Sequence, residues 1–500
     1  MVTRNLMTSM RPFWLLGVGA LAALLILALI WLIAYLVHRR TAIVISEIVR
    51  EKVVFPVLML AMAFGLFTLV MTAIDYGGGR FFDLKVAALK SLLRIPQVGQ
   101  RQWTVDVPAG TADQEIVVKI PAGELNSIQL EADQLLTISW NRPVSQAESD
   151  EDLAELRSDE PFGWVRGPEP SGPLAGQLQS IFVTNETKSP ARVSIDIDQQ
   201  IVVPEARIIV YTALGLVLFV MFYVALQLFF PKIAAVALTT GKEAVNQPLY
   251  YLTMTAGCFL LLLFIFTPYF TFGEDVKVYK DAGLQLIMIL AIIVALWTAS
   301  VSVAEEIEGR TALTVLSKPI SRQQFVLGKY LGIVSPVALM FILLGTLFLI
   351  CISYKVMYDA RESSNAYVVW QDCHLEVIRM VPGLVLAFME TVVLAAISVA
   401  ISTRLSMLAN LTICTAIYVV GHLLPLLVQS GVGEFAIVQF MGQLFATILP
   451  VLEHFNIYGA VAAGKDVPLS YLGWVGVYTL VYVTIAMLLA LALFDDRDLA

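Results

Sequence analysis

Residues 304–333 read AEEIEGRTALTVLSKPISRQQFVLGKYLGI and lie between two long apolar segments. Pro319 would end a helix that begins near the start of this stretch, because proline lacks the backbone donor that a helix interior needs. Ser321 with Gln324 forms the pattern of a capping box, which opens a new helix. The stretch therefore predicts a short helix, a break, and a second helix that runs into the membrane.

The short helix would be amphipathic. Glu306 and Arg310 are four residues apart, in the order that favours an ion pair on a helix surface. Leu313, Leu316 and Ile320 would share one apolar side. A helix of this kind can lie across the inner face of a membrane and act as a rigid lever for a soluble partner. The alternative is an ordinary connecting loop, but such loops seldom contain this many helix-capping and helix-breaking residues.

The rest of the chain is dominated by long apolar segments. Of its 500 residues, 58% are hydrophobic and 14% are charged. A soluble chain is about 25% charged, so there is too little charge here to cover a soluble surface. Segments of about 20 apolar residues are long enough to cross a bilayer. We therefore expect an α-helical polytopic membrane protein with about nine transmembrane helices, at residues 12–37, 54–74, 208–230, 249–272, 283–304, 329–353, 383–402, 406–428 and 472–494.

The distribution of Lys and Arg indicates the orientation, because cytoplasmic loops are enriched in both. With the C-terminus in the cytoplasm, the inner loops carry modestly more of these residues than the short outer loops. An odd number of spans then places the N-terminus outside. One cluster conflicts with this bias, since Arg80, Lys85, Lys90 and Arg94 follow the second span and would be outside. Their near-helical spacing predicts an amphipathic helix on the outer lipid surface.

Residues 100–205 have a different pattern, in which apolar and polar residues alternate. Alternation at period two, interrupted by Pro, Gly and Asn, predicts an antiparallel β-sandwich of about seven strands. Within it, residues 145–176 are acidic, rich in Pro and Gly and without an apolar run, which predicts a long mobile loop. The alternative is a ligand- or calcium-binding loop, but the carboxylates lack the regular spacing of an EF-hand loop. The alternating apolar residues are Val105, Val107, Ile116, Val118, Ile120, Ile128, Leu130, Leu136, Ile138, Ile181, Val183, Val193, Ile195 and Ile197.

Motifs of catalysis are missing from the sequence. The pairs Gly241-Lys242, Gly328-Lys329 and Gly464-Lys465 lack the upstream Gly and following Ser or Thr of a phosphate-binding loop. There is no GxSxG, HExxH or paired CxxC, so we expect no catalytic residue and no enzyme activity. Cys373-His374 could contribute to a copper or zinc site, but nothing nearby completes one, and a structural role is favoured. The net charge of −8 excludes a nucleic-acid binder driven by bulk charge.

Glu390, in LAFMETVVLAA, is the clear ionisable exception within the apolar spans, with His422 near the end of the eighth. Intramembrane carboxylates are costly and often functional. The structural alternative is that Glu390 bonds a Ser or Thr of a neighbouring helix, or stays protonated. A single carboxylate is too little for an ion-coupled carrier, which needs a relay or a coordination site.

Four features in order carry a family resemblance over about half of the chain. The first is an approach segment, AVALTTGKEAVNQPLYYL (235–252), and the second is Glu305, Glu306, Glu308, Gly309, Arg310, Thr311, Leu316, Ser317, Lys318, Pro319, Ile320, Ser321 and Arg322, followed by Gly328-Lys329. The others are the turn at 401–407 before a span ending VVGH (419–422), and ILPVLEHFNI (448–457) before the last span. From about Lys232 to Ala500 the chain resembles the permease subunit of type-2 ATP-binding-cassette (ABC) exporters, closest to the multicopper-enzyme-maturation branch.

The resemblance implies a coupling helix at about 305–322 that docks on a separate ABC ATPase subunit. ATP and Mg²⁺ would then be bound by that partner, with no cofactor or metal on this chain. It also implies short re-entrant helices within about 433–457, and a plasma (bacterial inner) membrane location. Without an internal repeat, two chains would form the functional dimer, as a homodimer or with a related permease. The coupling residues would be Glu305, Glu306, Glu308, Gly309, Arg310, Leu313, Leu316, Pro319, Ser321 and Arg322.

The expected organisation therefore has four parts. Two transmembrane helices occupy 1–75, an extracytoplasmic amphipathic helix and β-rich domain 76–205, a third transmembrane helix 206–230, and a six-helix permease core 231–500. The favoured function is the permease of an ABC export system driven by a separate ATPase. The alternatives are a non-transporting membrane scaffold or sensor with an extracytoplasmic binding domain, and an ion-coupled carrier that uses Glu390.

Overall fold

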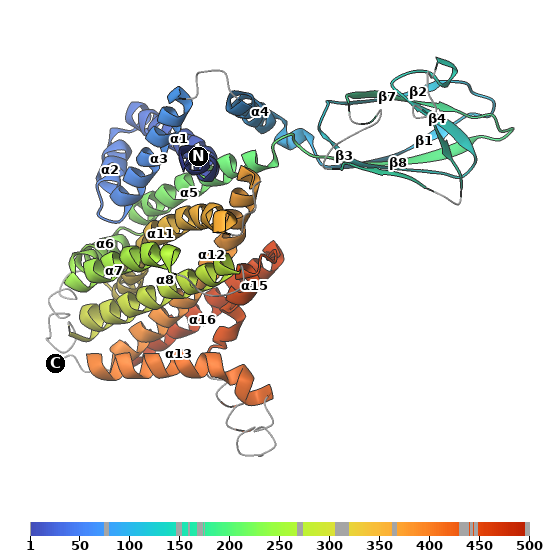
Figure 1. Ribbon diagram of the computed structural model, residues 1–500. Coiled ribbons are helices and arrows are strands. Elements are labelled where there is room, and N and C mark those ends of the chain that lie inside the picture. Colours follow the sequence, from blue (N-terminus) through green and yellow to red (C-terminus); the bar gives the residue numbers. More distant parts are fainter. Residues whose placement is uncertain are drawn as a thin grey trace. The chain divides into compact units, whose positions relative to one another are not determined.

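The computed structural model describes residues 2–74, 80–146, 153–158, 161–167, 174, 176–267, 274–305, 320–362, 368–429, 440, 444 and 449–495. The chain divides into two compact units (Figure 1). One is helical and comprises Met1–Val70 with Tyr211–Ala500, and the other is mostly β-structure and comprises Met71–Val210. The expected architecture, a polytopic helical membrane protein with an inserted β-rich domain, is confirmed.

Within the described residues, eight helices are long and apolar enough to cross a membrane. The expected span at 406–428 is also helical, as α13 (Met407–Gln429), but its apolar part among the described side chains, Met407–Leu423, is shorter. The eight are α1 (Val2–Val37), α3 (Val54–Ile74), α5 (Arg207–Phe229), α7 (Pro248–Phe266), α8 (Asp275–Ala299), α11 (Arg322–Glu362), α12 (Trp370–Ser402) and α16 (Leu469–Asp495).

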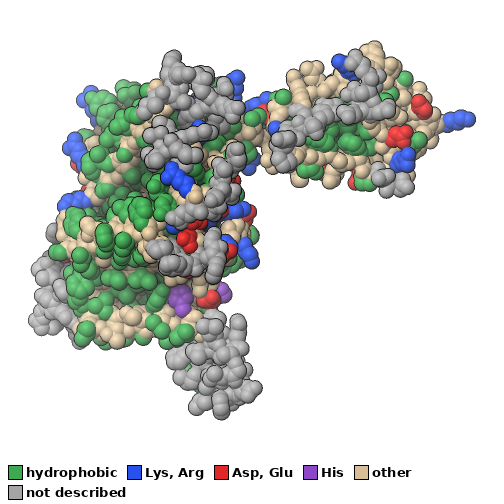
Figure 2. Space-filling view, in the orientation of Figure 1, with side chains coloured by type: hydrophobic (Ala, Val, Ile, Leu, Met, Phe, Trp, Pro, Cys, Tyr) green, Lys and Arg blue, Asp and Glu red, His purple; other side chains and the backbone are tan. Residues whose placement is uncertain are grey.

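Helices α8, α11 and α12 form the centre of the helical unit, and the remaining spans surround them. Large apolar side chains on the surrounding helices point outward, for example Leu252 and Phe259 on α7 and Leu480 on α16. Figure 2 shows hydrophobic side chains covering much of this unit's surface. Such a surface is unfavourable in water and suits contact with lipid.

Short helices complete the helical unit. Helix α2 (Arg39–Val49) follows α1, and α6 (Pro231–Asn246) precedes α7. Helix α6 packs along α11 at two glycines one turn apart, Gly328 and Gly332. A Cβ atom on Gly332 would lie 2.8 Å from the carbonyl oxygen of Ala237 and 2.6 Å from the Cβ of Thr240. Glycine therefore permits an approach of the two helices that a larger residue would block.

The described residues of the second unit form eight strands in two four-stranded antiparallel sheets, ordered β1-β8-β3-β6 and β2-β7-β4-β5. The expected sandwich is confirmed, and its core consists largely of the alternating apolar residues, such as Ile128, Ile138 and Ile195. The strands are β1 (Gln100–Val107), β2 (Gln114–Ile120), β3 (Leu125–Ala132), β4 (Leu136–Trp140), β5 (Leu153–Leu156), β6 (Phe162–Val165), β7 (Leu178–Thr184) and β8 (Ala191–Gln199).

The expectation that residues 145–176 form one long loop is wrong in part. Strand β5 pairs with β4, and β6 pairs with β3, so this segment contributes an edge strand to each sheet. Leu156 is fully buried, and Phe162 and Trp164 pack against the core. Each strand has only four residues, too few to display an alternating pattern in an acidic context.

The predicted helix after the second span is present as α4 (Arg80–Arg94). Its C-terminal part exposes Leu89 and Leu93, whereas Lys85 is buried and its Nζ lies 3.5 Å from the carbonyl oxygen of Met71. At the end of the helix Arg94 forms an ion pair of 3.2 Å with Glu124 of the β-structure. Its contact with lipid stays a prediction.

Candidate functional site

The buried carboxylate that the sequence singled out has a partner. Glu390, in the middle of α12, has no exposed surface, and its Oε1 lies 2.8 Å from Nε2 of His422 on α13. The expectation that Glu390 stands alone is therefore wrong. Helices α12 and α13 are consecutive and joined by a tight turn, so two residues at similar distances from that turn come to the same depth. The similar distances of Glu390 and His422 from the turn are visible in the sequence and could have predicted this pair.

A third ionisable group follows. The Nδ1 atom of His422 lies 3.8 Å from Oε2 of Glu453, which belongs to a short 3-10 helix, η8 (Leu452–Phe455). The exposed fraction of the side chains rises along the row, from 0% at Glu390 through 21% at His422 to 43% at Glu453. Histidine and acidic side chains meet on the surface of this region (Figure 2). The three groups connect a buried carboxylate with the exterior.

Three tyrosines of α16 hold the segment that carries Glu453. The hydroxyl of Tyr478 accepts a hydrogen bond from the backbone N–H of Val451 at 2.9 Å. The hydroxyl groups of Tyr471 and Tyr482 donate to the carbonyl oxygens of His454 at 2.7 Å and of Leu449 at 3.2 Å. The position of Glu453 is thus set by α16 as well as by its own short helix.

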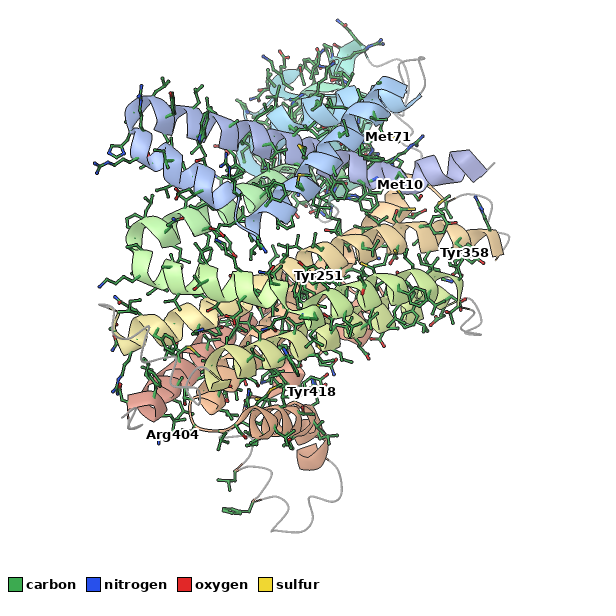
Figure 3. The ribbon with its side chains drawn as sticks, turned by 90° about the vertical axis from the view of Figure 1, so that its left-hand side faces the viewer. Met10, Met71, Tyr251, Tyr358, Arg404 and Tyr418 are labelled. Atoms are coloured by element: carbon green, nitrogen blue, oxygen red, sulfur yellow. The ribbon has the colours of Figure 1, made fainter. Side chains whose placement is uncertain are left out.

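The same segment approaches α13 closely at Gly421, next to His422. A Cβ atom on Gly421 would lie 2.8 Å from Cγ of Leu452, whose side chain is fully buried. One turn before the histidine on α13, the ring of Tyr418 packs edge-on against it at 4.8 Å between centroids. Tyr418 marks the position of this part of α13 in Figure 3.

The row of three groups can hold and pass protons. A protonated imidazole donates from both ring nitrogens, and both here face a carboxylate. A neutral imidazole can accept a proton on one side while it donates on the other. Among the described residues, no group of three or more His, Cys, Asp or Glu side chains is arranged to hold a metal ion. The hydrogen bond between Glu390 and His422 supports proton binding at this pair.

Most of the expected coupling residues lie outside the described residues: Glu306, Glu308, Gly309, Arg310, Leu313, Leu316 and Pro319. Of Glu305 only the backbone is described. Ser321 and Arg322 are described, and the predicted capping box is present. The backbone N–H of Ser321 donates to Oε1 of Gln324 at 3.1 Å, and the N–H of Gln324 donates to Oγ of Ser321 at 3.2 Å.

Residues on both sides of the 306–319 segment are fixed to the bundle. After it, Arg322 forms an ion pair of 3.1 Å with Asp495 at the end of α16, and its guanidinium lies over the ring of Phe494. Before it, α8 continues into a π-helical turn, Ser300–Glu305. Asn410 of α13 donates to the hydroxyls of Ser300 and of Ser398 on α12, each at 2.8 Å. Sequence reasoning missed Asn410 and Asp495, because these contacts join distant helices.

The neighbouring pair Cys373 and His374 is buried on α12. Within the next two turns of the helix are charged links to other elements, which the sequence alone does not pair. Lys280 of α8, itself buried, forms an ion pair with Glu376, and Arg379 pairs with Asp466 at 3.0 Å. The first contact ties α8 to α12, and the second ties α12 to the segment that follows α15 (Tyr458–Ala462). They support a structural role for this end of α12.

Residues 269–499 match the family model described as ABC-2 family transporter protein. This match covers α8 to α16, which include Glu390, His422, Glu453 and both flanks of the 306–319 segment. It supports a permease component of an ABC system, a class of transporter subunit without its own catalytic site. No curated protein is detectably similar to the chain. The ABC-2 region leaves out α1 to α7 and the whole β-rich unit.

Proposed function

We propose that the chain is the transmembrane permease subunit of an ABC exporter, of the multicopper-enzyme-maturation-like branch. It would couple ATP hydrolysis by a separate ATPase subunit to substrate movement out across the plasma membrane. The observation that supports this most is that the 306–319 segment lies inside the ABC-2 region, and that the described residues on both sides of it contact the bundle through Ser300 with Asn410 and through Arg322 with Asp495. A segment anchored at both ends can transmit a push to the helices that hold it.

The two anchors lead to different helices. A displacement of the segment reaches α11 through the capped start at Ser321, and it reaches α12 and α13 through Ser300 and Asn410. ATP-driven closure of two ATPase subunits would thus move the central helices of two paired permeases. ATP and Mg²⁺ would remain on the partner, because this sequence has no phosphate-binding loop.

Leu316→Glu tests the proposed contact with the ATPase. A charge placed in a desolvated contact costs several kcal/mol, so the variant is expected to lose the ATPase in a pull-down and to lose transport. Arg310→Glu is the matched control, because a charge at a solvated rim is worth only ~0–1 kcal/mol. Surface expression and dimerisation of both variants should remain normal. Wild-type recovery of the ATPase by Leu316→Glu, with transport intact, would contradict the proposal.

A second candidate function is favoured by one observation. Glu390 and His422 lie 2.8 Å apart, and Glu453 lies 3.8 Å from the other ring nitrogen, so the row places three protonatable groups where an ion-coupled carrier would need its proton relay. In that case substrate movement would depend on a proton gradient, and a partner ATPase would be dispensable. The family match favours the first function, since ABC-2 permeases typically work with an ATPase partner.

A further inference from the structure

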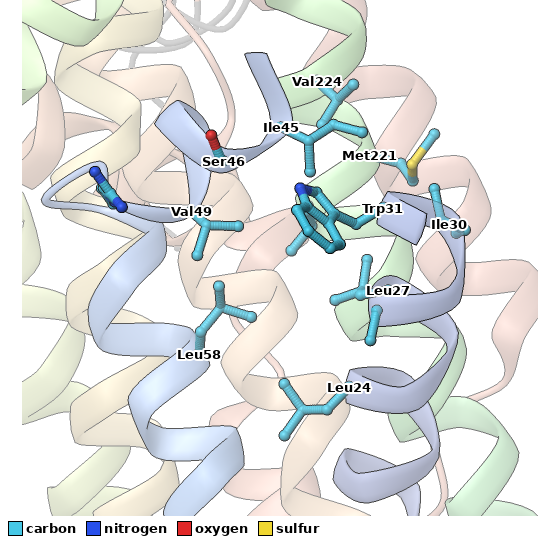
Figure 4. A pocket seen from close by; sticks show the side chains of 13 residues that line it. Leu24, Leu27, Ile30, Trp31, Ile45, Ser46, Val49, Leu58, Met221 and Val224 are labelled. Carbon is cyan, nitrogen blue, oxygen red and sulfur yellow. The ribbon is translucent and has the colours of Figure 1, made fainter. Parts of the chain in front are cut away.

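An apolar pocket of about 420 Å³ lies among α1, α2, α3 and α5, outside the ABC-2 region. Figure 4 shows Leu24, Leu27 and Trp31 of α1 along one side and Leu58 of α3 with Val49 of α2 opposite them. The volume falls within the ~300–1,000 Å³ of pockets that hold small organic ligands. Its walls therefore offer an apolar ligand a site built from four helices.

Two lining residues, Ser46 and Arg50, are polar, and both lie toward the end of α2. Arg50 is exposed, and no ion-pair partner of its guanidinium is found among the described residues. Its acidic neighbour Glu51 is engaged elsewhere, with Lys242 of α6 at 2.9 Å. Glu47, a turn earlier on α2, is exposed. A cation is thus available at the edge of an apolar pocket.

The surroundings are those of a membrane interface. Trp31 and Tyr35 stack near the end of α1, and the guanidinium of Arg39 lies 5.6 Å from the ring of Tyr35. Helix α2 begins with two arginines, buries Ala42 and Ile48, and exposes its polar side. Aromatic rings and basic residues at the end of a span, followed by an amphipathic helix, are typical of the headgroup region.

We propose that this pocket binds an anionic phospholipid. An acyl chain lies between α1, α3 and α5, and Arg50 meets the net negative charge of the headgroup, which a zwitterionic lipid lacks. The positive charge of Arg50 at the edge of the pocket favours an anionic headgroup. Residues 38–53 are expected on the cytoplasmic side, where the membrane leaflet is rich in anionic lipids. The occupant would bridge α1 to α2, which connects through Glu51 and Lys242 to α6 and so to α11.

Fluorescence quenching by lipids with brominated acyl chains tests the proposal on the purified full-length protein in detergent. The chain has eight tryptophans, so the signal of Trp31 is the difference between the wild type and Trp31→Phe. We expect brominated phosphatidylglycerol to quench this difference signal in a saturable manner at a few lipids per protein. Unbrominated phosphatidylglycerol should relieve the quenching in the wild type, a result that needs no variant.

Arg50→Gln tests the headgroup contact. Loss of one basic contact near an anionic headgroup should weaken the apparent affinity for phosphatidylglycerol about fivefold, with little effect on phosphatidylcholine. Arg40→Gln removes the same charge from the same helix outside the pocket lining and should weaken binding less. Quenching that rises without saturation and equally for both headgroups would show annular lipid only and would overturn the proposal. The same holds if Trp31→Phe leaves the quenching unchanged.

Discussion

The Nε2 atom of His422 lies 2.8 Å from Oε1 of Glu390, a carboxylate with no exposed surface, while its other ring nitrogen faces the half-exposed Glu453. Desolvation of a carboxylate is expensive unless a donor or an opposite charge compensates it. His422 supplies that compensation on a neighbouring helix. The pair therefore joins α12 to α13. Replacement of either residue should lower the free energy of unfolding.

His422→Ala should destabilise the protein more than Glu390→Gln. The first variant leaves the buried carboxyl without its ring partner, which costs ~1–3 kcal/mol of unfolding free energy. The second keeps an oxygen that can accept a hydrogen bond from the imidazole. The double variant should lose about 0.5–3 kcal/mol less unfolding free energy than the sum of the losses in the two single variants. Thermal unfolding in detergent at neutral pH measures all three, and strictly additive losses would contradict direct coupling.

Glu390→Gln should keep most partner-dependent transport. In an ATPase-driven permease the row of protonatable groups is not the energy source, and the amide preserves the packing of α12 against α13. Transport into inverted vesicles is the measurement, with ATP supplied and the proton gradient intact, and wild type with the gradient collapsed is the reference for a gradient-driven contribution. Near-complete loss of transport in a variant that assembles normally would favour the carrier function instead.

Gly332→Ala and Gly215→Ala should have opposite effects on stability. A methyl group on Gly332 meets the backbone oxygen of Ala237 at 2.8 Å, so α6 and α11 must separate, at a cost of ~1–3 kcal/mol. Nothing lies within 4 Å of the same methyl on Gly215 in α5, where alanine is the better helix former by ~0.5–1 kcal/mol. The measurement is the thermal unfolding midpoint of each variant, compared with that of the wild type in the same detergent. A stabilised Gly332→Ala would contradict the close packing of α6 on α11.

The parts of the fold that rest on periodicity could be predicted from the sequence. Ile128, Leu130, Ile195 and Ile197 alternate with polar residues and all point into the sandwich core. Eight of the nine long apolar segments are membrane-length helices among the described residues, and Ser321 with Gln324 forms its capping box. Each of these signals lies within one element, so tertiary contacts were not needed to read it.

Contacts between elements could not be predicted in the same way. Strands β5 and β6 are defined by their pairing with β4 and β3, since their own four residues carry no clear alternation. The links Arg322 to Asp495 and Asn410 to Ser300 connect residues far apart in the chain. Glu390 and His422 can each be picked out in the sequence. Their pairing follows only when the distance of each residue from the turn between α12 and α13 is compared.

Glu124 should make the β-rich unit less stable as the pH rises through the mildly acidic range. Burial raises the pKa of its carboxyl above 4.5, and the nearby Arg94 guanidinium opposes that rise in pKa. A raised folded-state pKa means that the folded protein binds the proton more tightly than the unfolded chain does. Stability from this group is thus full below the unfolded pKa and is lost as pH rises through the folded pKa.

Glu124→Gln removes this titration and should flatten the dependence of unfolding on pH in that window. Arg94→Gln removes the opposing charge and should move the window to higher pH. Calorimetric scans of the full-length protein between mildly acidic and neutral pH follow both effects. An unchanged slope in Glu124→Gln would mean that another group causes the pH dependence.

The β-rich unit should be outside the cytoplasm and α6 inside it, because spans α5, α7 and α8 lie between this unit and the 306–319 segment. Lys188→Cys, exposed on the β-rich unit, and Glu243→Cys, exposed on α6, report the two sides. The background is favourable, since Cys351, Cys373 and Cys414 are buried and Cys258 is only partly exposed. An impermeant thiol reagent added to intact cells with a permeabilised outer barrier should label Lys188→Cys at once. Glu243→Cys should be labelled only after lysis, because the reagent must reach the opposite face. Reversed labelling of the two variants would invert the topology, and it would place the 306–319 segment where no ATPase could dock.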